Sequence, residues 1–329
     1  MGKKISQLNA NELPYDGHEL VAIVEAGETR GGTLSSFMNY LTGGVYNAGG
    51  VTPGVQPIAS TLKNNHFCVT QSVVGSLSAS CNLIIGNNQS TEATLGTYAS
   101  VAGGDSNIAA GTCSFIGGGC SNTASGNGSF IGAGGTNIAA GVSSFIGGGA
   151  INCATGGFST VVGGHNNEAC NVDTFVGGGG SNLACCHGSA VGGGRSNTAA
   201  ACMTFVGGGC SNVAGDADPG FDTVAGGHDN MATCGAAFVG GGSSNCAYAM
   251  SAAVVGGTSN LASGQGSIIG GGRGNTSSGD CSVVVGGCTN SATGLSSFVG
   301  GGRNNGASGQ GSVIVGGAAH TATARDTFV

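Results

Sequence analysis

Apolar and polar positions follow a pattern that returns every 15 residues over most of the chain. An asparagine marks each repeat, and we count positions from it as position 0. Position −6 is Val or Ile and position −3 is Gly in all 15 repeats, position +2 is Ala in all but one, and position −8 is usually Ser or Thr. One interval of 18 residues interrupts the series, and His320 replaces the asparagine in the last repeat. The asparagines are Asn107, Asn122, Asn137, Asn152, Asn167, Asn182, Asn197, Asn212, Asn230, Asn245, Asn260, Asn275, Asn290 and Asn305.

This periodicity predicts an all-β fold, a parallel β-solenoid with one coil per repeat. A helical hairpin repeat needs roughly 33 residues or more, whereas 15 residues suit two short strands and two tight turns. The β-branched residue favours a strand, and Gly-Gly shortly before Asn favours a turn. Coils stacked at ~4.8 Å would align the asparagines in a structural amide ladder along a rod roughly 70 Å long.

Positions −7 and −5 compensate each other in size. Where position −7 is Phe, position −5 is Gly, as in Phe115 and Gly117; where position −5 is Val, position −7 is smaller, as in Thr160 and Val162. Such compensation indicates dense packing on one face of a strand. Position −6 points to the opposite face, and a thin coil can enclose only one of the two. We therefore expect the other face to be buried by further copies of the chain, most simply around a three-fold axis.

Composition excludes several classes of protein. The chain has 71 Gly but only 4 Pro, and Gly does not fall at every third residue as collagen requires. The net charge is −7 with 8 Lys and Arg spread along the chain, which argues against nucleic acid as a partner. No apolar run is long enough to insert in a membrane, and the start lacks the apolar core of a signal peptide. The composition favours an ordered, repetitive protein.

Cysteine is frequent but follows no metal-binding pattern. None of the 14 Cys form a pair with the spacing of a zinc site. Without a secretion signal, we expect reduced thiols that act as small apolar fillers. Cys170 and Cys185 occupy the same register in successive repeats, but their parallel side chains would strain a disulfide, so we expect free thiols there and at Cys186.

The repeats resemble a known family. Residues 118–126, 129–132 and 282–286 resemble the head repeats of Yersinia-type trimeric autotransporter adhesins in period and in their Ser, aliphatic, Gly and Asn positions. The resemblance covers about residues 99–329. It implies a left-handed parallel β-roll and a homotrimer. By the same analogy the Phe/Gly face lines the roll and the Val/Ile face meets the neighbouring subunits.

The start of the chain resembles another family. Residues 4–8, 19–24, 27–30 and 33–37 resemble the beginning of many phage tail fibre proteins. This implies a module that attaches to a tail or baseplate protein of the virion. The residues themselves predict a hairpin between Glu19 and Leu34, followed by a short helix from Leu34 to Leu41.

The chain therefore divides into four parts. Residues 42–56 are rich in Gly, Asn and Pro and predict a linker. Looser relatives of the coil occur around Val73 and around residues 83–86. The predicted parts are an attachment module at 1–41, a linker at 42–56, irregular β coils at 57–98 and a glycine-rich β-roll shaft at 99–329.

Position −2 is the candidate receptor-facing site. It varies freely and accepts charge, so it must face solvent, where a ladder of polar groups could bind a host surface glycan or receptor. The simpler interpretation is a solubilising stripe. Its basic members are His165, Arg195, His228, Arg273 and Arg303.

The 18-residue interval carries a weak candidate metal site. Asp216, Asp218 and Asp222 could offer oxygen ligands to a cation, but the EF-hand spacing is absent, so a plain bulged loop is favoured. We expect no metal and no cofactor.

Carboxylates are scattered along the shaft, and no Ser, His and Asp set converges, which predicts a protein that is not an enzyme. The sequence predicts a phage tail fibre that assembles in the host cytoplasm and presents its shaft for host attachment. The alternatives are a purely structural spacer or head fibre with a distal receptor-binding protein, and a polysaccharide-degrading tailspike. The last repeat is incomplete, which suggests a tip protein or a removed chaperone at the C-terminus.

Overall fold

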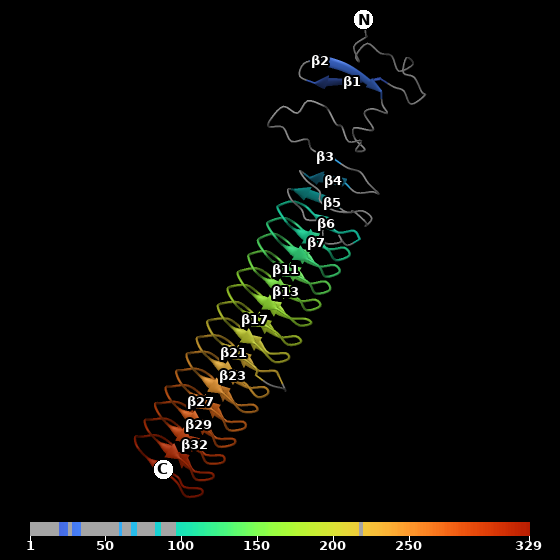
Figure 1. Ribbon diagram of the computed structural model, residues 1–329. Helices are drawn as coiled ribbons and strands as arrows, with labels where there is room; N and C mark the ends of the chain where they lie inside the picture. Colours follow the sequence, from blue (N-terminus) through green and yellow to red (C-terminus); the bar gives the residue numbers. More distant parts are fainter. Residues whose placement is uncertain are drawn as a thin grey trace, which may run out of the picture.

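The computed structural model describes residues 97–216 and 220–329 in full, together with the backbone of five strands between residues 20 and 86. Residues 97–216 and 220–329 wind into a straight rod of stacked coils (Figure 1). This rod is an all-β parallel solenoid, as the sequence predicts. No helix long and apolar enough to cross a membrane occurs among these residues.

Each coil contributes one short strand to each of two parallel sheets. Neighbouring coils pair in register, as in Phe130 with Phe145 and Ile131 with Ile146. The first sheet, which we call the Val/Ile sheet, contains β6 (Ser100–Val101), β8 (Phe115–Ile116), β10 (Phe130–Ile131), β12 (Phe145–Ile146), β14 (Thr160–Val161), β16 (Phe175–Val176), β18 (Ala190–Val191), β20 (Phe205–Val206), β22 (Thr223–Val224), β24 (Phe238–Val239), β26 (Ala253–Val254), β28 (Ile268–Ile269), β30 (Val283–Val284), β32 (Phe298–Val299) and β34 (Val313–Ile314).

The second sheet, the Ala sheet, carries position +2 and has 15 strands. It contains β7 (Ile108–Ala109), β9 (Thr123–Ala124), β11 (Ile138–Ala139), β13 (Cys153–Ala154), β15 (Glu168–Ala169), β17 (Leu183–Ala184), β19 (Thr198–Ala199), β21 (Val213–Ala214), β23 (Met231–Ala232), β25 (Cys246–Ala247), β27 (Leu261–Ala262), β29 (Thr276–Ser277), β31 (Ser291–Ala292), β33 (Gly306–Ala307) and β35 (Thr321–Ala322).

Position −2 adds a third line of pairing that the sequence did not predict. Single parallel bridges join this position from coil to coil, from Asp105 with Cys120 to Arg303 with Ala318. Each coil therefore touches the next along three lines. We call the line at position −2 the ridge.

The described N-terminal strands match the hairpin and the coil that the sequence predicts for their residues. β1 (Leu20–Glu25) pairs antiparallel with β2 (Glu28–Thr33), which confirms the predicted hairpin. β3 (Ala59–Ser60) pairs antiparallel with β4 (Phe67–Thr70), and β4 is followed in parallel by β5 (Leu83–Gly86) and then by β6. The predicted coil at residues 83–86 thus joins the Val/Ile sheet, whereas the predicted helix at 34–41 and the coil around Val73 lie outside the described residues.

The predicted assignment of inner and outer faces is wrong. Val and Ile at position −6 are fully buried and face the buried Ala of position +2, as in Ile131 and Ala139. Phe at position −7 lies outside, and Phe145 is 38% exposed. The physical reason is the width of the coil, because a two-layer interior with Ala on one side has room for an aliphatic group but not for a phenyl ring. The Phe and Gly positions compensate each other on the outer surface instead.

The two turns of a coil use left-handed backbone at fixed places. Gly119, at position −3, has φ +91°, and a Cβ there would collide with the carbonyl oxygen of Gly134 in the next coil. The residue before each asparagine is also left-handed, as in Ser121 with φ +56°. The asparagine itself is not, so its recurrence has another cause, which lies in its side chain.

Candidate functional site

The asparagines at position 0 form a buried hydrogen-bonded ladder. Asn122 donates its backbone N–H and its Nδ2 to Oδ1 of Asn107, at 3.0 Å each. Its Nδ2 also donates to the carbonyl oxygens of Gly118 at 3.1 Å and of Gly134 at 2.9 Å. The backbone N–H contact repeats from coil to coil, as at Asn167 and Asn245, and ends where the N–H of His320 donates to Oδ1 of Asn305 at 3.0 Å. An amide suits this position because it both donates and accepts without carrying charge.

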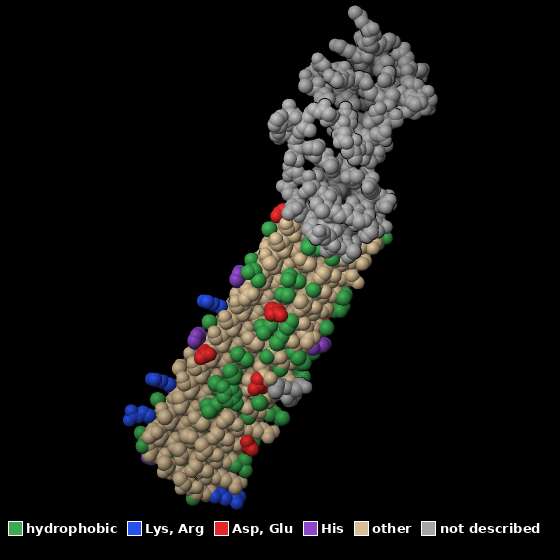
Figure 2. Space-filling model, viewed as in Figure 1, with side chains coloured by type: hydrophobic (Ala, Val, Ile, Leu, Met, Phe, Trp, Pro, Cys, Tyr) green, Lys and Arg blue, Asp and Glu red, His purple; other side chains and the backbone are tan. Residues whose placement is uncertain are grey.

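The ridge places the candidate receptor-facing residues together on the surface. All of them are exposed, as expected, and Figure 2 shows most of the basic side chains projecting from one long edge of the rod. Their backbone groups belong to the solenoid, since the N–H of Arg273 donates to the Gly287 carbonyl and the N–H of Arg303 to the Gly317 carbonyl, each at 2.9 Å. The side chains are therefore free to make contacts outside the coil.

A hollow lies beside the ridge towards the C-terminal end of the rod. It has a volume of about 280 Å³ and is lined by Thr289, Arg303, Asn304, Ala318 and Ala319. The two alanines leave space, while a guanidinium, an amide and a hydroxyl group stand around it. This combination can bind a small polar group that carries negative charge.

The three aspartates of the 18-residue coil do not form a single exposed set. Asp216 is exposed, but Asp222 is fully buried at position −8, where most coils carry Ser or Thr. Its Oδ1 accepts the N–H of Ala237 at 2.8 Å, and its Oδ2 is buried without a partner among the described residues. Burial raises the pKa of Asp222. Asp218 lies outside the described residues, and no group of three or more metal-binding side chains occurs in the part that is described.

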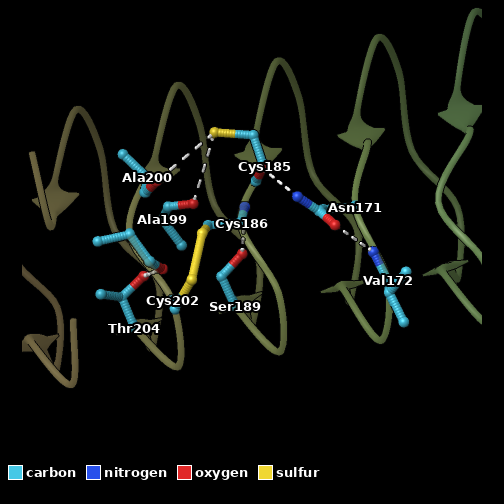
Figure 3. Close-up of a disulfide and its surroundings, with 10 residues drawn as sticks. Asn171, Val172, Cys185, Cys186, Ser189, Ala199, Ala200, Cys202 and Thr204 are labelled. Atoms are coloured by element: carbon cyan, nitrogen blue, oxygen red, sulfur yellow. Dashed lines mark hydrogen bonds between the residues drawn. A yellow bond between two sulfur atoms is a disulfide. The ribbon is translucent and has the colours of Figure 1, made fainter. Parts of the chain in front are cut away.

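The cysteines differ from the prediction at one pair. Cys186 and Cys202 form a disulfide between consecutive coils, with Cα atoms 4.8 Å apart (Figure 3). The prediction of a free thiol at Cys186 is therefore wrong, because this pair is separated by 16 residues, whereas cysteines in the same register are 15 residues apart. Cys170 and Cys185 are free, as predicted, and burial together with the neighbouring Cys185 thiol raises the pKa of Cys170 to about 11. Cys170 is thus a protonated, unreactive thiol at neutral pH.

The outer face of the Val/Ile sheet is uncharged along its whole length and mostly apolar. Positions −7 and −5 carry no charged residue in any coil, and Phe115, Phe130 and Phe145 stack in a row with ring centroids 5.2 Å apart. Several of these side chains are exposed, including Val162 at 47%, Val285 at 51% and Val315 at 58%. We call this surface the Phe/Val face.

Comparison with known proteins adds no family to these observations, since neither a family model nor a curated protein matches the chain.

Proposed function

We propose that this protein is a homotrimeric viral fibre, of the phage tail fibre type, whose shaft contacts the host surface. Its N-terminal part, residues 1–41, would attach it to a tail or baseplate protein of the virion. The rod form supports a role that spans distance, because a stack of coils extends by ~4.8 Å for each repeat.

The observation that carries the proposal is the Phe/Val face. A long, mostly apolar strip without charge is unusual on a monomeric protein and marks an interaction surface. The partner must offer apolar groups at the same ~4.8 Å interval over the length of the rod. Another copy of this chain, running in parallel, meets that requirement directly. The choice of three copies follows the resemblance to trimeric adhesin heads.

The assembly is tested by the mass of the purified full-length protein in multi-angle light scattering, which should equal three chains of 31.1 kDa. Val285→Asp, on the Phe/Val face, should dissociate the trimer. Thr258→Asp adds the same charge at an exposed position on the ridge and should leave it intact. A monomeric wild-type protein, or equal behaviour of the two variants, would refute the proposed interface.

The fibre role is tested on particles. Antibodies against the shaft should label projections of the intact virion in electron micrographs, and the purified trimer should adsorb to host cells. Labelled projections without adsorption would favour the structural spacer that carries a separate receptor-binding protein. Absence of label from the particles would refute the fibre role.

A further inference from the structure

The arginines of the shaft are concentrated on the ridge. The shaft, described at residues 97–216 and 220–329, contains four Arg and no Lys, and Arg195, Arg273 and Arg303 all lie at position −2. The fold does not demand them, because the same position also accepts Gly180, Ser243 and other small residues. In a chain of net charge −7, such a concentration of positive charge on one line calls for an explanation outside the coil.

The spacing of these charges is regular. Cys288 pairs with Arg273 on one side and Arg303 on the other, so the two guanidinium groups stand on alternate coils. At ~4.8 Å per coil, they recur at about 10 Å along the axis. Arg195 and His228 flank Cys210 in the same manner. No acidic residue occurs at positions −2 or −1 from Thr258 to Ala319.

The hollow beside Arg303 completes the arrangement. Asn304 and Thr289 supply hydrogen-bonding groups, and Ala318 and Ala319 supply a small apolar surface. A sugar ring needs this mixture, because its hydroxyl groups require hydrogen bonds while its C–H groups pack on apolar atoms. Arg303 adds a charged partner that can hold an anionic oxygen in a bidentate contact.

We propose that the ridge between Arg273 and Ala319 binds a linear anionic polysaccharide that runs along the rod. Acid groups of the polymer contact Arg273 and Arg303, and one sugar ring occupies the hollow. Nucleic acid fits poorly, because its charges recur about every 1.7 Å along a duplex, far more densely than the arginines. This inference rests on the proposed function and names the class of host surface material that the fibre recognises.

The test uses the full-length protein and biosensor surfaces coated with four probes. Polygalacturonate, a polyglycerol phosphate and dextran sulfate present carboxylate, phosphate and sulfate groups, and neutral dextran is the uncharged control. We expect the wild type to bind at least one anionic probe and not dextran, with affinity that falls as salt is added. The anionic probe that binds identifies the acid group.

Matched variants locate the site. Arg303→Gln and Arg273→Gln should each weaken binding tenfold or more. Arg325→Gln removes the same charge from an exposed position off the ridge and should change binding less than twofold. Circular dichroism checks that each variant keeps the fold. Equal losses in all three variants, binding to dextran, or no binding to any probe would overturn the proposal.

The two proposals fail in different ways. If antibodies against the shaft label the virion and the Arg303→Gln trimer adsorbs to host cells as well as the wild type does, the polysaccharide site is overturned and the fibre role stands. A ridge that binds polyanions through Arg303 in a protein that is absent from virions would overturn the fibre role alone.

Discussion

Removal of one asparagine from the ladder should destabilise the shaft far more than its small size suggests. Asn197 lies in the middle of the rod and is fully buried. Its Nδ2 donates to Oδ1 of Asn182 at 3.1 Å, to Gly193 O at 2.9 Å and to Gly209 O at 3.0 Å. Its Oδ1 accepts from N and Nδ2 of Asn212, at 3.0 and 3.1 Å. Asn197→Ala deletes all of these contacts.

Most of the partners retain another hydrogen bond after this change. Gly209 O still accepts the N–H of Arg195 at 2.9 Å, and Oδ1 of Asn182 still accepts the backbone N–H of residue 197 at 3.0 Å. The backbone N–H of Asn212, however, is left buried without an acceptor. One such orphaned group costs about 1–3 kcal/mol, and the lost side-chain bonds add to it. We therefore expect Asn197→Ala to lower the free energy of unfolding by about 2–4 kcal/mol.

The assay is guanidinium unfolding followed by circular dichroism, with hydrogen exchange of the Asn212 amide as a local probe. Ser196→Ala is the matched control, because Ser196 is the exposed neighbour of Asn197 and both Ser and Ala would occupy the same left-handed backbone conformation there. The control should change stability by less than about 0.5 kcal/mol. If the two variants unfold at the same denaturant concentration and the Asn212 amide keeps its protection, the ladder does not stabilise the coil.

Two further predictions concern the buried Asp222 and the Cys186–Cys202 disulfide of the shaft. Because burial raises the pKa of Asp222, its neutral form stabilises the fold fully at acid pH, and this stabilisation is lost as pH rises through the raised pKa of the folded state. Asp222→Asn keeps an acceptor for the Ala237 N–H, so in thermal unfolding scans it should match the wild type near pH 3 and be more stable than the wild type near pH 7. A stability difference that stays constant with pH would contradict the raised pKa of Asp222. The double variant Cys186→Ala, Cys202→Ala should lower the free energy of unfolding by about 3 kcal/mol, as expected when a disulfide that closes a short loop is removed. A reductant should bring the wild type to the same unfolding midpoint, and insensitivity of the wild type to reductant would argue against the disulfide.

The 15-residue period predicted most of the fold, but the alternation of side chains along each strand left open which face of the strand is inside. Spacing identifies which residues share a face, as Phe130 and Gly132 do, but it does not say which face is inside. That choice depends on the width of the coil. Ala at position +2 was visible in the sequence and, taken as the opposite wall, would have shown that Ile131 and not Phe130 fits the interior.

The other differences arise where local detail outweighs the repeat. Asp222 stands eight residues before Asn230, so counting back from the asparagine would have placed it in the buried Ser and Thr column. The Cys186 and Cys202 pair depends on how a turn of one coil sits against the next, which in-register spacing does not describe. The hollow beside Arg303 combines residues from successive coils and has no local sequence signal.

Each position of the coil has its own structural role, and these roles decide which positions can carry a function. Positions −8, −6, 0 and +2 are buried, and position −3 requires the left-handed backbone of glycine, so none of them can change freely. Positions −7 and −5 form an uncharged surface that is suited to other copies of the chain. The ridge is different, because its backbone is held by the solenoid while its side chains vary from Gly180 to Arg303. A rod built in this way can vary the side chains of the ridge without changing its buried interior, and the arginines are the strongest chemical specialisation that this chain places there.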